Sequence, residues 1–335
     1  MGDMTARGPR RAPLALVWLV ALAVSGCGSG PSSTPSPPAG PPSPSAPPTV
    51  GPATSPSLTP SGSESGSPSA SSGLPDFPYV WIIVFENQDY SRVVGAPDMP
   101  YFNGLIDRYG LAERASGVAR PSQPNYFALF SGSTQDVHDN GDHDIDAPTV
   151  VDQIEASGRT WKEYAENRPA GCFTGGSASG GRDGQGVYRR KHAPAISFDG
   201  IRNDPQRCAD LVDFTAFKPG DVDYSLIIPN QCHAAHDCNA TEADAWLAGF
   251  APTILDSQAF AAGGVLIVTF DEDAGNDPGG GHVATIVASR SVPAGFRSAE
   301  PHDHYSVLRT VQDAWGLDCL AESCSATPMR EFFGG

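Results

Sequence analysis

The chain has 335 residues, 18% of them charged and 39% hydrophobic, and its formal net charge at pH 7 is −17. Such an excess of acid argues against a nucleic-acid-binding protein and disfavours contact with anionic lipid. The chain has seven cysteines. The cellular compartment decides whether they form disulfides or serve metal or redox chemistry.

Residues 1–26 have the pattern of an export signal. Three arginines among residues 7–11 precede an apolar run, residues 14–24, that is too short to span a bilayer. The run ends in 23-AVSGC-27, which resembles the lipobox of bacterial lipoproteins, in which Cys27 would be acylated and become the new N-terminus. A plain secretory signal is the alternative. Either predicts export, and loss of residues 1–26, with three arginines and one aspartate, changes the net charge from −17 to −19.

Residues 27–74 are predicted to form a tether behind the acylated cysteine. From Gly28 on, the segment is almost entirely Pro, Ser, Gly, Thr and Ala, and Glu64 is its one charged residue. It cannot bury enough apolar surface to offset its chain entropy. Residues 75–335 remain for a single large α/β domain.

The first half of this domain alternates strands and helices. Tyr79–Phe85 is apolar, β-branched or aromatic throughout, as in a strand buried on both faces. A helix is predicted next over 98–110, capped by Asp98 and stopped by Gly110, and a strand follows to Val118. The segment 121-PSQPNYFALFSG-132 predicts a helix with Ser122 at its N-cap. A helix over 149–158, a strand over 160–166 and a glycine-rich loop over 175–186 complete this half.

The second half repeats the alternation. It predicts strands over 224–230, at the start of 264-GVLIVTFDEDAG-275, and over 282–289. It also predicts a long helix over 241–260 and a closing helix over 303–316. This order predicts an α/β fold with a doubly wound, mainly parallel sheet flanked by helices.

The cysteines fit a disulfide framework once Cys27 is assigned to lipid. Six remain in an exported domain, and the chain has no Cys-x-x-Cys pair of the kind found in zinc ribbons. Two pairs lie close enough in sequence to close short loops, which leaves the third. The predicted bridges are Cys172–Cys208, Cys232–Cys238 and Cys319–Cys324.

Two of the predicted buried strands end directly in acidic or amide residues. Glu86 and Asn87 follow the first strand, and Asp271 and Glu272 follow another. Ligands of open α/β sheets bind beyond the carboxyl ends of the strands. Oxygen donors converging there suit a hard or borderline divalent ion. The alternative is that both strands simply end in solvated polar residues.

Ser122 is the third element of the candidate site. A hydroxyl at a helix start, beside a cation and backbone amides that favour anions, is suited to attack a phosphoryl group. A serine that only caps its helix is the alternative.

These residues resemble the bacterial and fungal phosphoesterases that include acid phosphatases and phospholipases C, within the alkaline-phosphatase-like superfamily. The resemblance extends from Tyr79 to about Gly316. It rests on the segments ENQDYS, PSQPNYFALFSGS, YRRKHAPAISFDGIRND, PNQCHAAHDC, VTFDEDAG and DHYSVLRTVQDAWG.

The resemblance implies an alkaline-phosphatase-like core and one divalent metal ion of unknown identity, with Ca, Mg, Mn or Zn all compatible. The implied ligands are Glu86, Asn87, Asp271, Glu272 and the hydroxyl of Ser122, which is also the implied nucleophile. The residues implied to surround the phosphate or serve catalysis are Asn125, His192, His236, Asp237 and, more weakly, His304. The segment 273–282 departs from the family pattern, which leaves the role of His282 open.

We therefore expect a metal-dependent hydrolase of phosphate monoesters, similar to acid phosphatases, that acts on a small phosphorylated substrate. It would reach the membrane only through the Cys27 anchor and would bind no nucleic acid. A phosphodiesterase of phospholipase C type is the second interpretation. It ranks lower because the net negative charge disfavours anionic membranes and because we expect no added lipid-binding module after the last predicted helix. A surface lipoprotein that binds phosphorylated ligands without catalysis is the third.

Overall fold

The computed structural model describes residues 73–179 and 187–334, so the predicted signal, the lipobox and almost all of the tether lie outside the described residues. The strands are β1 (Val80–Phe85), β2 (Gly110–Ser116), β3 (Trp161–Ala165), β4 (Ser177–Ser179), β5 (Val187–Arg189), β6 (Leu211–Asp213), β7 (Tyr224–Ile228), β8 (Val265–Phe270), β9 (His282–Ala288) and β10 (Phe296–His302). The α-helices are α1 (Tyr90–Val93), α2 (Pro100–Arg108), α3 (Gln123–Ser131), α4 (Val150–Ala156), α5 (Asp199–Arg202), α6 (Pro205–Cys208), α7 (Ala240–Leu255), α8 (Gln258–Ala261) and α9 (His304–Trp315). Short 3-10 helices include η1 (Arg190–His192) and η2 (Pro194–Ser197).

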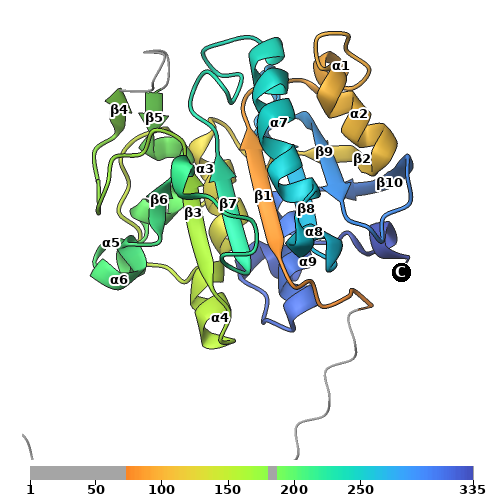
Figure 1. Ribbon diagram of the computed structural model, residues 1–335. Coiled ribbons are helices and arrows are strands. Elements are labelled where there is room, and N and C mark those ends of the chain that lie inside the picture. The colour runs from red at the N-terminus through yellow and green to blue at the C-terminus, as the bar shows by residue number, and fades with distance from the viewer. Residues whose placement is uncertain (1–72, 180–186, 335) are drawn as a thin grey trace, which may run out of the picture. The chain divides into compact units, whose positions relative to one another are not determined.

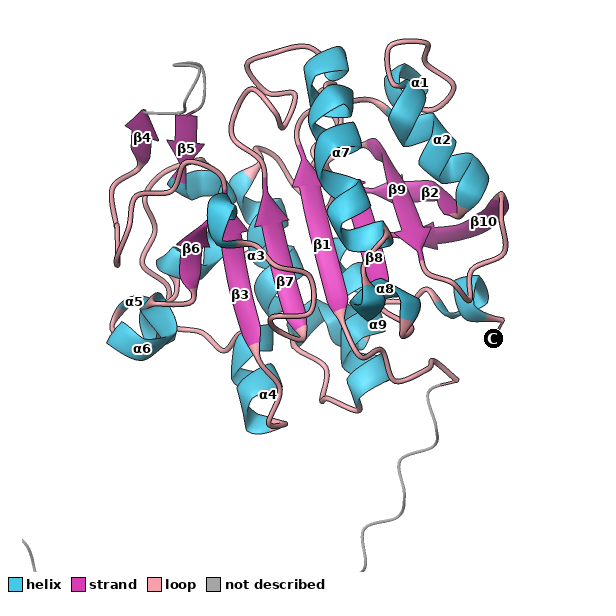
Figure 2. Cartoon of the chain, viewed as in Figure 1, coloured by secondary structure: helices cyan, strands magenta, loops and turns pink. Residues whose placement is uncertain are grey.

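Eight strands form one sheet in the order β10-β2-β9-β8-β1-β7-β3-β6, and β4 pairs with β5 apart from it. In the large sheet β9 runs antiparallel to both of its neighbours, and the other neighbouring strands are parallel to each other. The arrowheads of β1, β3 and β7 consequently point to the same edge, at the top of Figure 2. The predicted α/β class with a mainly parallel sheet is confirmed.

Helices cover both faces of this sheet, as a doubly wound fold requires. Helices α1, α2, α7 and α8 lie in front of it in Figure 1, and α3 and α9 lie behind it. Within the described residues, we find no helix with the length and apolar character that a membrane span needs.

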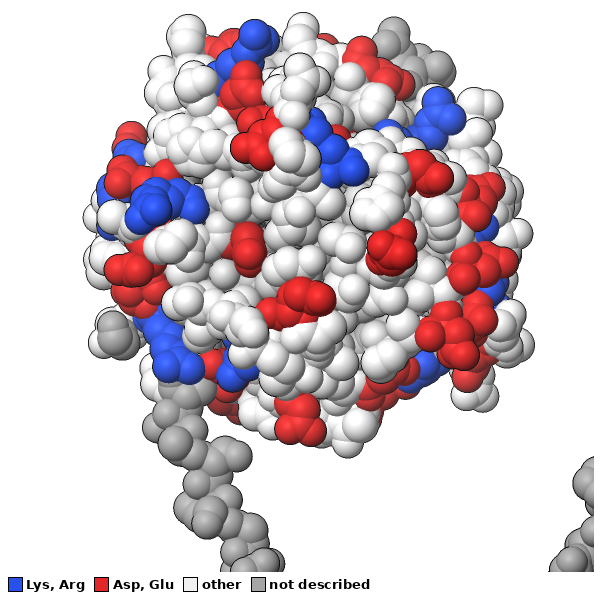
Figure 3. Space-filling model, turned by 180° about the vertical axis from the view of Figure 1, so that it is seen from behind, with Lys and Arg blue, Asp and Glu red and all other residues white. Residues whose placement is uncertain are grey.

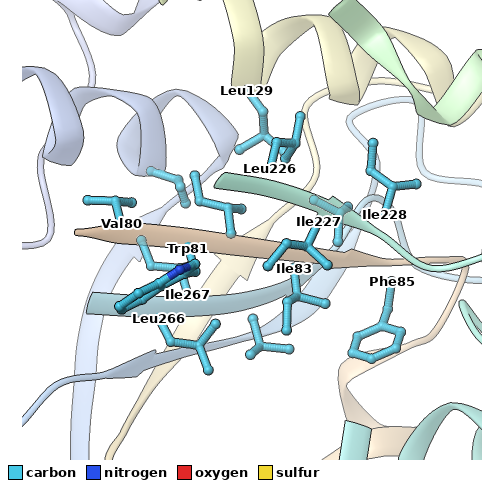
Figure 4. Close-up of a cluster of buried hydrophobic side chains, with 14 of the residues drawn as sticks. Val80, Trp81, Ile83, Phe85, Leu129, Leu226, Ile227, Ile228, Leu266 and Ile267 are labelled. Atoms are coloured by element: carbon cyan, nitrogen blue, oxygen red, sulfur yellow. The ribbon is translucent and has the colours of Figure 1, made fainter. Parts of the chain in front are cut away.

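The core forms around β1 and β8, which are buried along their whole length. In Figure 4 Leu129 of α3 and Leu226 of β7 lie on one side of β1, while Trp81 and Phe85 point to the other side. Apolar packing on both faces explains the unbroken apolar run that predicted this strand.

Several predicted boundaries were wrong for local reasons. The helix expected over 241–260 is two helices, because the Ser257 hydroxyl accepts the Phe260 amide and starts α8. Asp98 does not cap α2, whose N-cap is Met99 and whose first residue is Pro100. Gly110 does not stop a helix but begins β2. Part of the predicted loop 175–186 is β4, and residues 180–186 lie outside the described residues.

The three predicted disulfides, Cys172–Cys208, Cys232–Cys238 and Cys319–Cys324, are all present. Such bridges are typical of exported proteins. On the face shown in Figure 3, acidic and basic side chains are interspersed around a broad area of uncharged residues.

Candidate active site

The ends of β1 and β8 bring the predicted metal ligands together. The strands are parallel neighbours whose last residues, Phe85 and Phe270, are paired. The backbone amide of Asn87 donates to Asp271 Oδ1 at 3.0 Å, and the Asn87 side chain donates to Glu86 Oε2 at 3.2 Å. The structure thus assembles the strand-end residues in one cluster, while their role as metal ligands stays a prediction.

Ser122 lies in the same cluster. It occupies the N-cap position of α3, but its side chain makes no capping hydrogen bond. Its hydroxyl lies 3.2 Å from Glu86 Oε2 and 3.2 Å from Glu272 Oε1, so that it can donate to either carboxylate. The side chain of Asn140 instead accepts the amide of Gln123, the first residue of the helix, at 3.0 Å.

Two glycines allow the loop before Ser122 to approach the end of β8. Gly117 follows β2, and its amide donates to the carbonyl of Gly281 at 3.0 Å. A Cβ on Gly117 would lie 2.8 Å from the Asp271 carbonyl oxygen, and one on Gly280, whose φ is +80°, would lie 2.7 Å from Gly117 Cα. Only glycine fits such a contact between two backbones.

The cluster holds three buried carboxylates. Burial raises the pKa of Glu86, and burial together with the charge of Glu86 raises the pKa of Asp271 well above its usual range. Burial and the charge of Asp271 raise the pKa of Glu272 to about 7. Arg120 offsets part of this charge, with Nη1 at 3.1 Å from Glu272 Oε2.

The chemistry of these donors fits a divalent cation. In the described part of the chain, Asp271 Oδ2 is buried and has no hydrogen-bond partner, and neither Glu86 nor Asp271 pairs with a lysine or arginine. Buried carboxylates in contact need a positive charge to stay ionised together. No three His, Cys, Asp or Glu side chains among the described residues are already arranged to hold an ion, so the metal stays a prediction.

His192 supports this cluster from the side. Its Nδ1 accepts from the side-chain amide of Gln231 at 2.8 Å, and its Nε2 lies 3.1 Å from Glu86 Oε2 but makes no hydrogen bond within the described structure. The ring stacks against Tyr126, whose hydroxyl donates to Glu86 Oε1. Burial, followed by the charge of Lys191, lowers the pKa of His192 well below its usual range, so this ring is neutral.

A cavity of about 450 Å³ adjoins the cluster, and its lining includes Asn140, Lys191, Gln231, His236 and Asp237. Asn140 and Gln231 connect it to the start of α3 and to the buried imidazole through the hydrogen bonds described above. His236 Nδ1 lies 2.7 Å from Asp237 Oδ1, and its ring centroid lies 5.8 Å from that of His192. The Cys232–Cys238 disulfide closes the loop that carries this pair.

Two residues predicted to contact substrate bind backbone beside the carboxylate cluster. Asn125 is fully buried, and its side-chain oxygen accepts the amides of Val118 and Ala119, so it fastens the loop before Ser122. His304 is also buried, with Nε2 donating to the backbone carbonyl of Asp271 at 2.6 Å. Both hold backbone near the site, and contact of either with substrate stays a prediction.

His282 lies outside the cluster of carboxylates. Its ring stacks on Tyr90 with centroids 4.1 Å apart, and its Nε2 donates to the carbonyl of Glu113. Four further residues of the site were not predicted from the sequence, although each belongs to or adjoins a segment quoted above. They are Arg120, Tyr126, Lys191 and Gln231.

Comparison with known proteins identifies the family of the chain. A model described as the phosphoesterase family matches residues 94–318, a span that includes Ser122, His192, His236, Asp271 and Glu272. The chain is 30% identical over 272 residues to the phosphatidylinositol-3-phosphatase of Mycobacterium tuberculosis, covering 79% of this chain and 86% of that protein. It is 29% identical over 259 residues to a probable acid phosphatase of Kluyveromyces lactis, covering 73% of this chain and 59% of that protein.

An acid phosphatase of Aspergillus fumigatus is 27% identical over 261 residues, with 75% of this chain and 57% of that protein covered. The chain thus spans less than two thirds of the length of these two fungal relatives. Among solved structures, a protein in the alkaline phosphatase superfamily from Vibrio parahaemolyticus has a TM-score of 0.52 at 11% identity, covering 78% of this chain and 73% of that one. A putative sulfatase from Bacteroides thetaiotaomicron has a TM-score of 0.51 at 12% identity, with 77% and 75% covered.

The solved structures show the fold alone, and the family match with the mycobacterial relative shows the family. The chain belongs to the phosphoesterase family, and it is a hydrolase of phosphate esters built on an alkaline-phosphatase-like fold.

Proposed function

We propose that the protein hydrolyses phosphate monoesters with Ser122 as nucleophile and one divalent metal ion held by Glu86, Asn87, Asp271, Glu272 and Ser122. One observation supports this most strongly: the Ser122 hydroxyl, at a helix start, does no capping and contacts two buried carboxylates from different strands. A serine that only caps its helix would place its oxygen on the backbone amides of the first turn.

A bound divalent ion would neutralise the carboxylates and lower the pKa of the serine hydroxyl. Ser122 gives its proton to a carboxylate oxygen 3.2 Å away, and its Oγ attacks phosphorus while the bond from phosphorus to the leaving alcohol breaks. Water then attacks the phosphoserine, the bond from phosphorus to Oγ breaks, and Ser122 takes a proton back as phosphate leaves.

The leaving alcohol needs a proton, for which the sequence offered either His192 or His236. Because His192 is buried beside Glu86 and is not among the residues that line the cavity, it is not placed to protonate the alcohol. His236 lines the cavity and has Asp237 behind its Nδ1. It is therefore the group we assign to leaving-group protonation at mildly acidic pH.

The names of the relatives support a monoester substrate, since each is called a phosphatase. The finer statement that this chain is an acid phosphatase is part of the proposal. So is the cell-surface location through acylated Cys27, which lies outside the described residues. Replacing Cys27 by serine should release the protein from the membrane fraction, and retention there would contradict the anchor.

Replacement of Ser122 tests the mechanism. Ser122→Ala should lower kcat for p-nitrophenyl phosphate by about 10³-fold or more, with little change in Tm because no cap is lost. Ser131→Ala is a matched control, because this hydroxyl is buried at the other end of α3 and bonds the Phe127 carbonyl. Activity of Ser122→Ala comparable to wild type would remove Ser122 from the mechanism. A phosphodiester assayed in parallel shows which ester is preferred.

A further inference from the structure

Lys191 carries a positive charge that the mechanism above does not use. Its ammonium lines the cavity and donates to His236 Nε2 at 3.2 Å. In the part of the chain that the structure describes, it pairs with no carboxylate. The preceding Arg190 differs, because it is buried and holds Asp144 and the backbone carbonyls of Thr174 and His143. Lys191 is therefore a cation available to a ligand.

A chain of side-chain contacts joins Lys191, in the cavity wall, to the nucleophile Ser122. From Lys191 the contacts run through His236 to His192, with ring centroids 5.8 Å apart. From His192 they run to Glu86 at 3.1 Å, and from there to the Ser122 hydroxyl at 3.2 Å. After burial, the charge of Lys191 has the largest effect of any neighbouring charge on the pKa of both Glu86 and His192. An anion bound at the ammonium would thus lie at the cavity side of the nucleophile.

We infer that Lys191 binds a non-bridging oxygen of the substrate phosphate and selects the dianion of a monoester over the single charge of a diester. The inference rests on the proposed attack of Ser122 on phosphate. A phosphate monoester carries nearly two negative charges at pH 7, since its second pKa is near 6. A diester carries one charge, so it gains less from a cation that has no carboxylate of its own.

The contacts of His236 fit this assignment. In the free protein its Nε2 accepts from Lys191, so its Nδ1 proton points to Asp237 at 2.7 Å. The His236–Asp237 pair therefore fixes the ammonium at the cavity wall. When a phosphate oxygen takes the ammonium, His236 Nε2 no longer accepts from Lys191 and is left facing the cavity.

Lys191→Met tests the assignment in the metal-supplemented protein. We expect kcat/KM for p-nitrophenyl phosphate to fall by about 10- to 100-fold, the value of a hydrogen bond to a charged group, and kcat/KM for bis(p-nitrophenyl) phosphate to change by less than about 3-fold. Binding of inorganic phosphate, measured by calorimetry, should weaken by about 10-fold or more. Lys191→Arg should recover most of this binding because it keeps the charge.

Two control variants separate position from overall charge. Lys218→Met makes the same change at an exposed residue before β7, at the opposite edge of the sheet, and should alter neither reaction. Arg189→Met removes a cation from the rim of the same cavity and should have a much smaller effect than Lys191→Met. The assignment would be overturned if Arg189→Met lost as much kcat/KM as Lys191→Met. It would also be overturned if Lys191→Met lost equal kcat/KM for both esters, or if it bound inorganic phosphate as well as wild type.

The proposed function can fail separately. If the wild type hydrolyses no monoester with any metal, the Ser122 mechanism is wrong, while phosphate calorimetry on the wild type and on Lys191→Met still decides the role of the ammonium.

Discussion

Asp271→Asn should have opposite effects on stability without and with metal. Asp271 Oδ1 accepts the backbone amides of Asn87 and Glu272, at 3.0 and 2.6 Å. An asparagine keeps this acceptor and places its amide where Oδ2 is now buried without a partner in the described structure. The Glu86 side chain lies against that of Asp271, so the new amide can donate to a carboxylate.

The magnitude follows from the charge that is removed. An unsatisfied buried group costs about 1–3 kcal/mol, and more when it is charged. Because the pKa of Asp271 is raised in the folded state, its cost to stability is absent at acid pH and appears as the pH rises. We therefore expect the metal-free variant to be more stable than metal-free wild type by about 1–3 kcal/mol at pH 8, a rise in Tm of roughly 2–10 °C, and nearly equal to it below pH ~3.9, the pKa of an unfolded aspartate.

Added metal should reverse this order. The variant has lost a carboxylate ligand, and a 100-fold weaker affinity would remove roughly 3 kcal/mol of ligand stabilisation at a concentration that saturates the wild type. Thermal melts with EDTA and with each candidate metal, at pH ~3.5 and pH 8, measure both effects. A metal-free variant less stable than wild type at pH 8, or equal stabilisation of both proteins by metal, would refute the reasoning.

Two further predictions concern stability. Burial raises the pKa of Glu163 to about 7, against about 4.3 in an unfolded chain. The contribution of Glu163 to the free energy of unfolding is therefore full below pH ~4.3 and is lost as the pH rises through about 7. Glu163→Gln keeps an acceptor for the Ala195 amide and should remove this decline, worth roughly 4 kcal/mol, in melts between pH 4 and 8; an unchanged decline would count against it. Gly280→Ala should cost roughly 2–4 kcal/mol in denaturant unfolding, because φ is +80° and the Gly117 backbone is in contact, whereas Gly158→Ala, with φ +82° and open space, should cost about 1 kcal/mol. Equal costs would show that the contact is unimportant.

The sequence predicted the strands of the core because their signal is local. β1 and β8 are buried along their whole length, and each ends directly before an acidic residue, Glu86 or Asp271. β10 was missed because Phe296–His302 has no regular alternation and contains a proline, which an edge strand tolerates. β6 has three residues, too few to carry a pattern.

Within the site, residue types at strand ends could be predicted and their partners could not. The sequence marks Asn125 and His304 as polar residues in quoted segments, yet their polar atoms are bound to backbone near the nucleophile. Lys191 is one of three consecutive residues with basic side chains before His192, and nothing local distinguishes it from Arg190. The distinction arises from tertiary contacts, since Arg190 meets Asp144 and Lys191 meets His236.

Ser122 shows how such long-range contacts decide between two roles for one residue. A capping serine has extended backbone angles and bonds the amides of the first helical turn, whereas Ser122 has helical angles, φ −42° and ψ −51°, and bonds none of them. The Gln123 amide is satisfied by Asn140, a residue of a separate loop that also lines the cavity. Because Asn140 takes this bond, the hydroxyl can be directed to Glu86 and Glu272 with no unpaired amide at Gln123. Asn140→Ala should therefore weaken the start of α3 and disturb Ser122 together, which a serine acting as its own cap would not require.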